Sequence, residues 1–72
     1  ADSIRMLASH GVGVGGIPDP NAILDLQSTT KAWLPPRMTT AQRDAIPGPT
    51  EGMTVWNLDT HGLSSYNGTA WS

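Results

Sequence analysis

The chain has 72 residues, a formal net charge of −2 and four scattered basic side chains, so we expect one small domain, or a piece of a longer protein, that does not bind nucleic acid. It has no cysteine, which excludes disulfides and cysteine-ligated zinc, and no apolar run long enough to cross a membrane. Because a domain of this size buries only about 60% of the surface that its unfolded chain exposes, association with other chains is the source of stability that remains.

The first third of the chain is expected to be extended and rich in glycine. Residues 3–8 (SIRMLA) alternate as in a short strand, and GVGVGG follows at residues 11–16. Glycine within a strand lets another backbone approach closely, although the same run would also suit a flexible connector. The glycine spacing resembles a dinucleotide-binding fingerprint only by accident, because Pro18 prevents the helix that this fingerprint requires.

The next segment is expected to be extended and then to bend. Residues 21–27 (NAILDLQ) predict a short, half-buried strand. Residues 31–34 (KAWL) are expected to be extended as well, because Pro35 disfavours helical backbone in the residue before it. Neither Pro35 nor Pro36 has an N–H to donate, so this pair does not belong in a central strand.

One short helix is predicted after the prolines. Thr39 can cap it, and Gln42 three residues later completes a capping box. Pro47 ends the helix, which leaves room for about two turns. Because such a short helix is marginal in water, it must pack against something. The apolar side chains expected to turn toward a core are Met38, Ala45 and Ile46.

The last twenty residues predict a small antiparallel meander. Residues 53–58 alternate, residues 59–62 form a turn that ends in glycine, and residues 63–66 return. Asn67-Gly68 is the strongest hairpin signal in the chain, and residues 69–71 would form a third short strand.

The aromatic residues of the meander allow two interpretations. We favour Trp56 and Trp71 pairing across strands with Tyr66 as the core, because a chain without phenylalanine must bury something large. The alternative is that these three side chains and Asn67 contact a receptor or carbohydrate, with the rings stacked on sugars. Trp33 is expected to pack between chains.

No arrangement of residues indicates catalysis, and no cofactor is expected. Asp59, His61, Ser64 and Ser65 are close in sequence, but a solvated turn explains them better than a serine-hydrolase triad. In a trimer His10 or His61 could form a ring of three imidazoles that binds a metal, although a surface histidine is the commoner case.

The run from Ala22 to Trp71 resembles a module that recurs in bacteriophage tail fibre and tail spike proteins and in some bacterial surface proteins. The motifs that carry the resemblance are LD at residues 24–25, STTK at 28–31, LPPRMTT at 34–40, QR at 42–43, AI at 45–46, Gly52, VWN at 55–57, DT at 59–60, YNG at 66–68 and Trp71. Ala32 departs from the pattern, which usually has glycine there. The segment GVGVGGIPDP resembles, more loosely, a segment that often precedes such modules.

This resemblance implies a non-enzymatic structural module of a trimeric tail fibre or spike, extracellular and in the virion, that contributes to fibre assembly and host attachment. It implies a mainly β fold with one short helix and a small meander, in an elongated, intertwined homotrimer. Residues 1–20 would be an extended stem and residues 21–72 a helix-plus-meander module of a longer fibre protein. The implied partners are other copies of the chain, neighbouring fibre or tail proteins and a host-surface polysaccharide or receptor. The alternatives are a carbohydrate-binding tip and a fragment of a bacterial surface adhesin.

The resemblance also suggests which residues lie at bends and trimer contacts. Glycines would let three backbones crowd near a threefold axis, the prolines would carry the chain between subunits, and the capped helix would pack into a neighbour. The residues expected in these roles are Gly13, Gly15, Trp33, Leu34, Pro35, Pro36 and Ile46.

Overall fold

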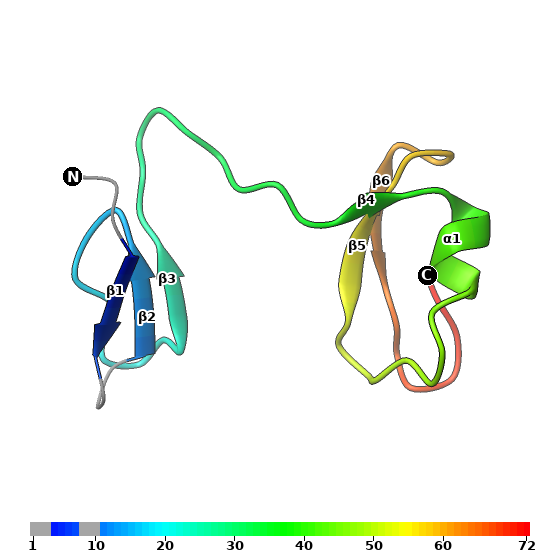
Figure 1. Cartoon of the computed structure of the whole chain (residues 1–72), viewed down its shortest axis with the longest axis horizontal. Coiled ribbons are helices and arrows are strands. Elements are labelled where there is room, and N and C mark those ends of the chain that lie inside the picture. Colours follow the sequence, from blue (N-terminus) through cyan, green and yellow to red (C-terminus); the bar gives the residue numbers. More distant parts are fainter. Residues whose placement is uncertain (1–3, 8–10) are drawn as a thin grey trace. The chain divides into compact units, whose positions relative to one another are not determined.

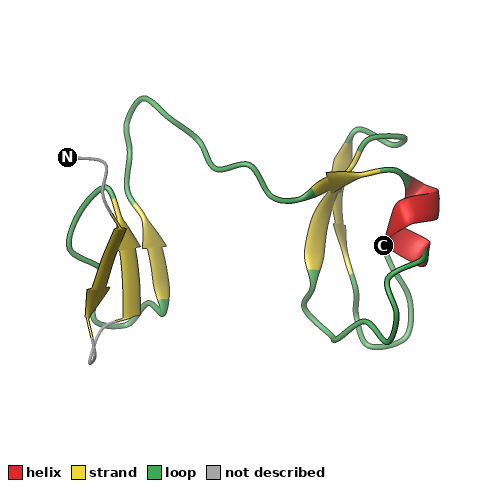
Figure 2. Ribbon diagram, viewed as in Figure 1, coloured by secondary structure: helices red, strands yellow, loops and turns green. Residues whose placement is uncertain are grey.

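The computed structural model describes residues 4–7 and 11–72. The chain forms two compact units that divide between Trp33 and Leu34 (Figure 1). Each unit contains one three-stranded sheet, and the helix lies in the second unit (Figure 2). The mainly β fold with one short helix is therefore confirmed. The contacts within the chain divide it after residue 33, and the stem expected over residues 1–20 stays a prediction.

The first sheet has the strand order β1-β2-β3. Its strands are β1 (Ile4–Leu7), β2 (Gly11–Val14) and β3 (Leu24–Leu26). Strand β2 pairs antiparallel with β1 and parallel with β3. Because paired residues share a face, Gly13 and its partner Asp25 lie on one face of the sheet. The residues that β2 and β3 place on the other face are Val12, Val14, Leu24 and Leu26.

The loop between β2 and β3 folds back over the glycine face. A Cβ atom at Gly13 would lie 2.7 Å from Cδ of Pro18, so only glycine fits beneath this loop. The Asp25 carboxylate accepts a hydrogen bond from the Asp19 N–H at 2.8 Å, and the Gln27 amide donates to the Ile17 carbonyl at 2.7 Å. The predicted close approach of a second backbone to the glycines is confirmed, and this backbone belongs to the same chain.

The second sheet corrects the predicted antiparallel meander. Its elements are β4 (Arg37–Met38), α1 (Thr40–Asp44), β5 (Thr54–Asn57) and β6 (Gly62–Ser65). The β5–β6 hairpin is antiparallel, as predicted, but β4 adds to β5 in parallel and makes the sheet mixed. The predicted third strand is reduced to a single antiparallel bridge between Tyr66 and Trp71. The sequence pattern misses β4 because a two-residue strand has no periodicity of its own.

The proline pair leads directly into this edge strand. The Pro36 carbonyl accepts a hydrogen bond from the Trp56 N–H at 2.8 Å, and the Met38 carbonyl accepts from the Leu58 N–H at 2.8 Å. Proline is tolerated at this position because an edge strand needs hydrogen bonds on one side only.

The predicted capping box of α1 is confirmed. The Thr39 hydroxyl accepts from the Gln42 N–H at 3.2 Å, and the Gln42 side-chain oxygen accepts from the Thr39 N–H at 2.9 Å. The helix is shorter than predicted, because its C-cap is Ala45, two residues before Pro47. Ala45 is exposed, so its predicted place in the core is wrong, whereas Met38 and Ile46 are half-buried.

Two turns shape the end of the chain. In the β5–β6 turn, the residue with left-handed backbone is His61, with a φ of 57°. The glycine of this turn, Gly62, comes one residue later. The Asn67-Gly68 dipeptide predicts a turn, and Gly68 has a φ of 96° in a four-residue loop between Tyr66 and Trp71, across which the Asn67 N–H donates to the Ala70 carbonyl at 3.0 Å. Among the described residues, no helix combines the length and the hydropathy that a membrane span requires.

Candidate assembly surfaces

One face of the second sheet is covered by the chain itself. Val55 and its partner Ser64 lie on this face, as does Asn57 two residues further along β5. Helix α1 and the C-terminal segment lie on the same side of the sheet (Figure 1). Val55 is 4% exposed, and within residues 11–72 it is the only buried aliphatic or aromatic side chain apart from two prolines.

Asn57 organises the covered face although it is polar. Its side chain has no exposed surface. The side-chain oxygen accepts from the Asp59 N–H at 2.8 Å and from the Thr60 N–H at 3.2 Å, and the side-chain nitrogen donates to the Thr40 hydroxyl at 3.0 Å. One buried amide therefore fixes the hairpin turn and attaches α1 to β5.

A second polar group on the covered face holds the C-terminal segment. The Ser64 hydroxyl, 1% exposed, donates to the Ser72 carbonyl at 2.7 Å and accepts from Arg43 at 3.0 Å. The Arg43 guanidinium lies 5.5 Å from the centroid of the Trp71 ring and also binds Asp44 at 2.9 Å. Helix, strand and C-terminal segment therefore meet at one arginine.

The opposite face of the second sheet is open, and we call it the C-terminal open face. A row of three side chains crosses its strands, with Trp56 in the middle. Arg37 on β4 and Leu63 on β6 are each paired with Trp56. Leu58, two residues beyond Trp56 on the same side, continues the face. Leu63 is 59% exposed and Leu58 is 44% exposed, while Trp56 is half-buried.

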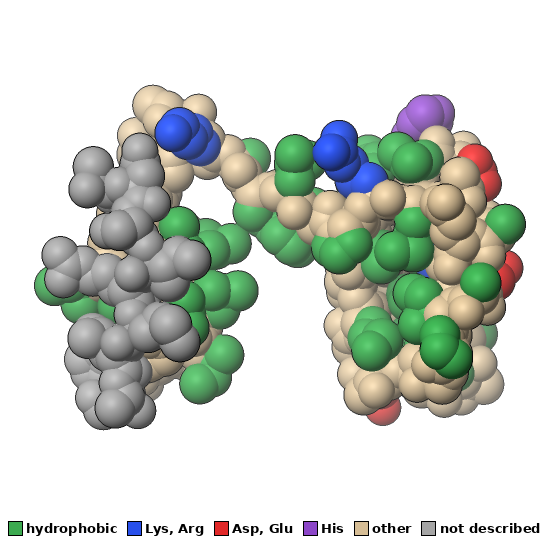
Figure 3. Space-filling model, viewed as in Figure 1, with side chains coloured by type: hydrophobic (Ala, Val, Ile, Leu, Met, Phe, Trp, Pro, Cys, Tyr) green, Lys and Arg blue, Asp and Glu red, His purple; other side chains and the backbone are tan. Residues whose placement is uncertain are grey.

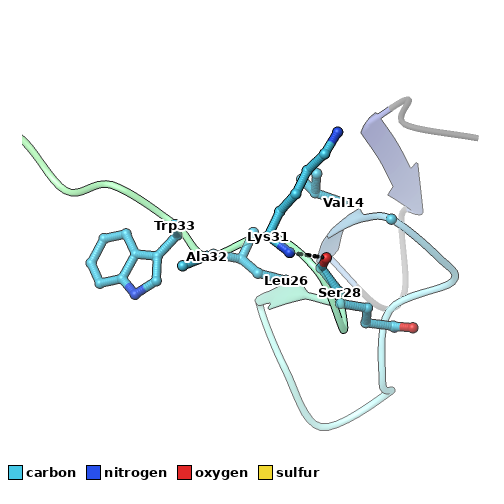
Figure 4. Close-up of a pocket in the computed structure, with 8 residues that line it drawn as sticks. Val14, Leu26, Ser28, Lys31, Ala32 and Trp33 are labelled. Atoms are coloured by element: carbon cyan, nitrogen blue, oxygen red, sulfur yellow. Dashed lines mark hydrogen bonds between the residues drawn. The ribbon is translucent and has the colours of Figure 1, made fainter.

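The first unit has a comparable surface, the N-terminal open face, formed by Val12, Val14, Leu24 and Leu26. Leu24 is 56% exposed and Leu26 is 45% exposed. The face continues into a pocket of about 380 Å³, which Val14 and Leu26 line from the sheet (Figure 4). The segment after β3 supplies the other wall, where Trp33 is 56% exposed. The Lys31 N–H donates to the Ser28 hydroxyl at 2.8 Å, which holds this segment in a turn.

Both units therefore expose large hydrophobic side chains (Figure 3). Those exposed are Ile17, Ile23, Leu24, Leu26, Trp33, Leu34, Met53, Leu58 and Leu63. A packed layer architecture buries one face of a sheet against another element, and each sheet here already has one covered face. The remaining apolar faces are of the kind that marks a contact with another molecule.

A family described as "Phage tail like trimerisation region" matches residues 11–72. The chain belongs to this family. It is therefore a structural module of a phage tail and a component of the virion, and the resemblance to tail fibre modules is confirmed. The match includes both open faces. No curated protein and no solved structure matches the chain significantly.

The aromatic residues predicted as one core or one receptor site do not come together in this family member. Tyr66 and Trp71 pack against each other, with ring centroids 5.3 Å apart. Trp56 belongs to the opposite face, because it alternates with Val55 and Asn57 along β5. Asn67 lies in the exposed turn, where its side chain accepts from the N–H groups of Thr69 and Ala70, both at 2.8 Å.

The residues expected at bends lie in different surroundings. Leu34 is 73% exposed, Pro35 is buried, and Pro36 joins the sheet through its carbonyl. Helix α1 packs on its own sheet, whereas the resemblance suggests a neighbouring chain. A Cβ atom at Gly15 would overlap the Gln27 carbonyl, so contacts within the chain account for glycine there as they do at Gly13.

Sequence reasoning misses the three polar residues that hold the second unit together, Arg43, Asn57 and Ser64. Asn57 carries a usable signal, because an asparagine two residues before Asp59 commonly accepts from the backbone of a turn. Arg43 and Ser64 carry none, since their contact joins positions 21 residues apart.

The positions considered for chemistry are also placed. The Ser64 hydroxyl is held between Arg43 and Ser72, and His61 is exposed on the turn before β6. His10 lies outside the described residues. Among the described residues, no group of three or more histidine, aspartate or glutamate side chains is arranged to hold a metal ion.

Proposed function

We propose that this module joins three copies of its chain and thereby assembles a tail fibre or spike. The observation that carries the proposal is that each unit covers one sheet face with its own chain and leaves the other face open and apolar. Membership of a family of trimerisation regions supports a homotrimer as the assembly that covers these faces. Cyclic symmetry gives such an assembly a closed, finite size.

The N-terminal open face is the first proposed contact between copies. Leu24 and Leu26 lie side by side with Val12 and Val14, so the face is continuous and contains no charged side chain from β2 or β3. The pocket beside it would receive side chains of a neighbouring copy against Trp33. Removing such apolar surface from water contributes about 25 cal/mol per Å². The association would therefore supply the burial that each unit lacks.

In host attachment, the proposed role of this module is to support the fibre in the extracellular part of the virion. Tyr66 packs on Trp71, Trp71 packs on Arg43, and Trp56 lies on the other side of the sheet. This arrangement favours a structural module over a carbohydrate-binding tip, whose aromatic rings would share one exposed surface.

A charge placed on the N-terminal open face tests the proposal. Leu24→Glu and Leu26→Glu are each expected to convert a three-chain species into single chains, because a carboxylate would have to be buried in the contact. The matched control is Ile23→Glu. Ile23 is 83% exposed and lies in the bend before β3, outside the strand residues that form the N-terminal open face.

Sedimentation velocity at one protein concentration distinguishes the outcomes. The proposal predicts that Ile23→Glu sediments as the unsubstituted chain does, while the two leucine variants sediment more slowly. A three-chain species that persists in both leucine variants would contradict the proposed contact.

A further inference from the structure

The residues of the C-terminal open face are arranged as in a protein–protein interface, with apolar side chains at the centre and a charged side chain at the edge. Trp56 occupies the middle strand β5, with Leu63 beside it on β6 and Leu58 further along the same face. The charged member of the row, Arg37, lies on the edge strand β4. A large aromatic side chain at the centre with arginine at the rim is the arrangement typical of protein–protein contacts.

The hydroxyls and several backbone groups of this face already have partners. The hydroxyls of Thr54 and Ser65, at the other end of the face, lie 3.0 Å apart in a hydrogen bond. The Thr54 hydroxyl also donates to the Gly52 carbonyl at 3.1 Å. The Trp56 and Leu58 N–H groups bind carbonyls of the β4 segment. Covering the face would therefore leave none of these groups unpaired, which lowers the cost of burying polar atoms, while the Trp56 indole N–H would find its acceptor in the contact.

The segments of the second unit that cover a sheet face all lie on the opposite face of this sheet. Helix α1 and the C-terminal segment are tied to the covered face through Asn57 and Ser64. The matched trimerisation region contains the whole of the second unit, residues 34–72. Another copy of this chain is therefore the occupant that the observations favour.

We infer that the C-terminal open face is a second contact between copies, with Trp56 and Leu63 buried at its centre and Arg37 at its rim. This inference rests on the proposed homotrimer, and it adds that the second unit contributes an interface of its own. The guanidinium of Arg37 stays hydrated at the edge strand while the two apolar side chains are removed from water.

Site-directed spin labelling tests this contact in the 72-residue chain. The chain contains no cysteine, so each single-cysteine variant carries one label. Leu63→Cys places a label on the C-terminal open face, and Leu58→Cys provides a second position there. The control is Ala41→Cys, an exposed residue of α1, which covers the opposite side of the sheet.

The labels at positions 63 and 58 are expected to be immobilised and to show dipolar broadening, because packed sheets lie about 10 Å apart. Dilution with unlabelled chain should remove the broadening, and the label at position 41 should stay mobile. Loss of the three-chain species in Leu63→Cys, with its retention in Ala41→Cys, would support the same contact.

The outcomes separate this inference from the proposed function. A three-chain species in which the labels at positions 63 and 58 are both mobile and unbroadened would overturn the second contact and leave the trimer intact. Single chains in the unsubstituted protein would overturn both.

Discussion

Asn57 has no exposed surface, yet both polar atoms of its side chain have partners. Its oxygen accepts from two backbone N–H groups of the turn, and its nitrogen binds the hydroxyl of Thr40 on α1. A buried amide with these partners specifies one arrangement of turn and helix, because any other arrangement would leave polar groups unpaired. At the scale of the residue, polar contacts therefore decide how the second unit folds.

Replacing this amide should destabilise the protein strongly. Asn57→Ala removes a fully buried side chain and leaves the part-buried N–H groups of Asp59 and Thr60 without their acceptor, which costs about 2–4 kcal/mol of unfolding free energy. Denaturant unfolding at a fixed protein concentration measures the loss.

The matched control for Asn57 is Asn67→Ala. Asn67 accepts from two backbone N–H groups in the same way, but its turn is exposed. Water can replace the lost acceptor there, so the expected cost is below about 1 kcal/mol. Equal losses in the two variants would contradict the role given to burial.

Gly13 provides a second test at the scale of the residue. Gly13→Ala would bring a methyl group against Pro18 and the Gly16 carbonyl, and the loop between β2 and β3 would have to move. The expected cost is about 1–3 kcal/mol, the range for overpacking in a closely packed place.

Gly62→Ala is the control for this glycine, because a Cβ atom at Gly62 meets nothing within 4 Å. We expect that change to be neutral or mildly stabilising, since alanine restricts the unfolded chain. If both variants unfold at the same denaturant concentration as the unsubstituted chain, the loop does not press on Gly13 in solution.

At the scale of the element, local signals predict local structure well. The capping box, the alternation of β5 and the Asn67-Gly68 turn each depend on residues within four positions of one another, and all three are confirmed. The parallel pairing of β4 and the contact of Arg43 with Ser64 depend on residues far apart in sequence, which no periodicity records. The open faces are predicted only in part, because the alternation of a strand predicts that it has two faces but not which of them α1 covers.

The capping box is itself testable. Thr39→Ala removes the acceptor for the Gln42 N–H, and a five-residue helix has few other hydrogen bonds to hold it. We expect a loss of about 1 kcal/mol in unfolding free energy, the typical value for an N-cap threonine. Thr69→Ala is the control, because Thr69 is exposed and contributes only its backbone N–H to the nearby turn. A loss at Thr69 as large as at Thr39 would show that the cap is not the cause.

At the scale of the whole molecule, the chain has too little buried apolar surface to be self-sufficient. Apart from two prolines, Val55 is the only buried aliphatic or aromatic side chain in residues 11–72, and both sheets keep one open apolar face. A single 72-residue chain with this exposure is expected to gain most of its stability from association. Neither composition nor periodicity could locate these faces, because exposure is a property of the folded chain.

The mass of the 72-residue chain in solution tests this account most directly. Sedimentation equilibrium over a dilution series should give the mass of three chains at high concentration, with folding lost as the complex dissociates. A folded single chain at every concentration would contradict the account, because both open faces would then be stable in water.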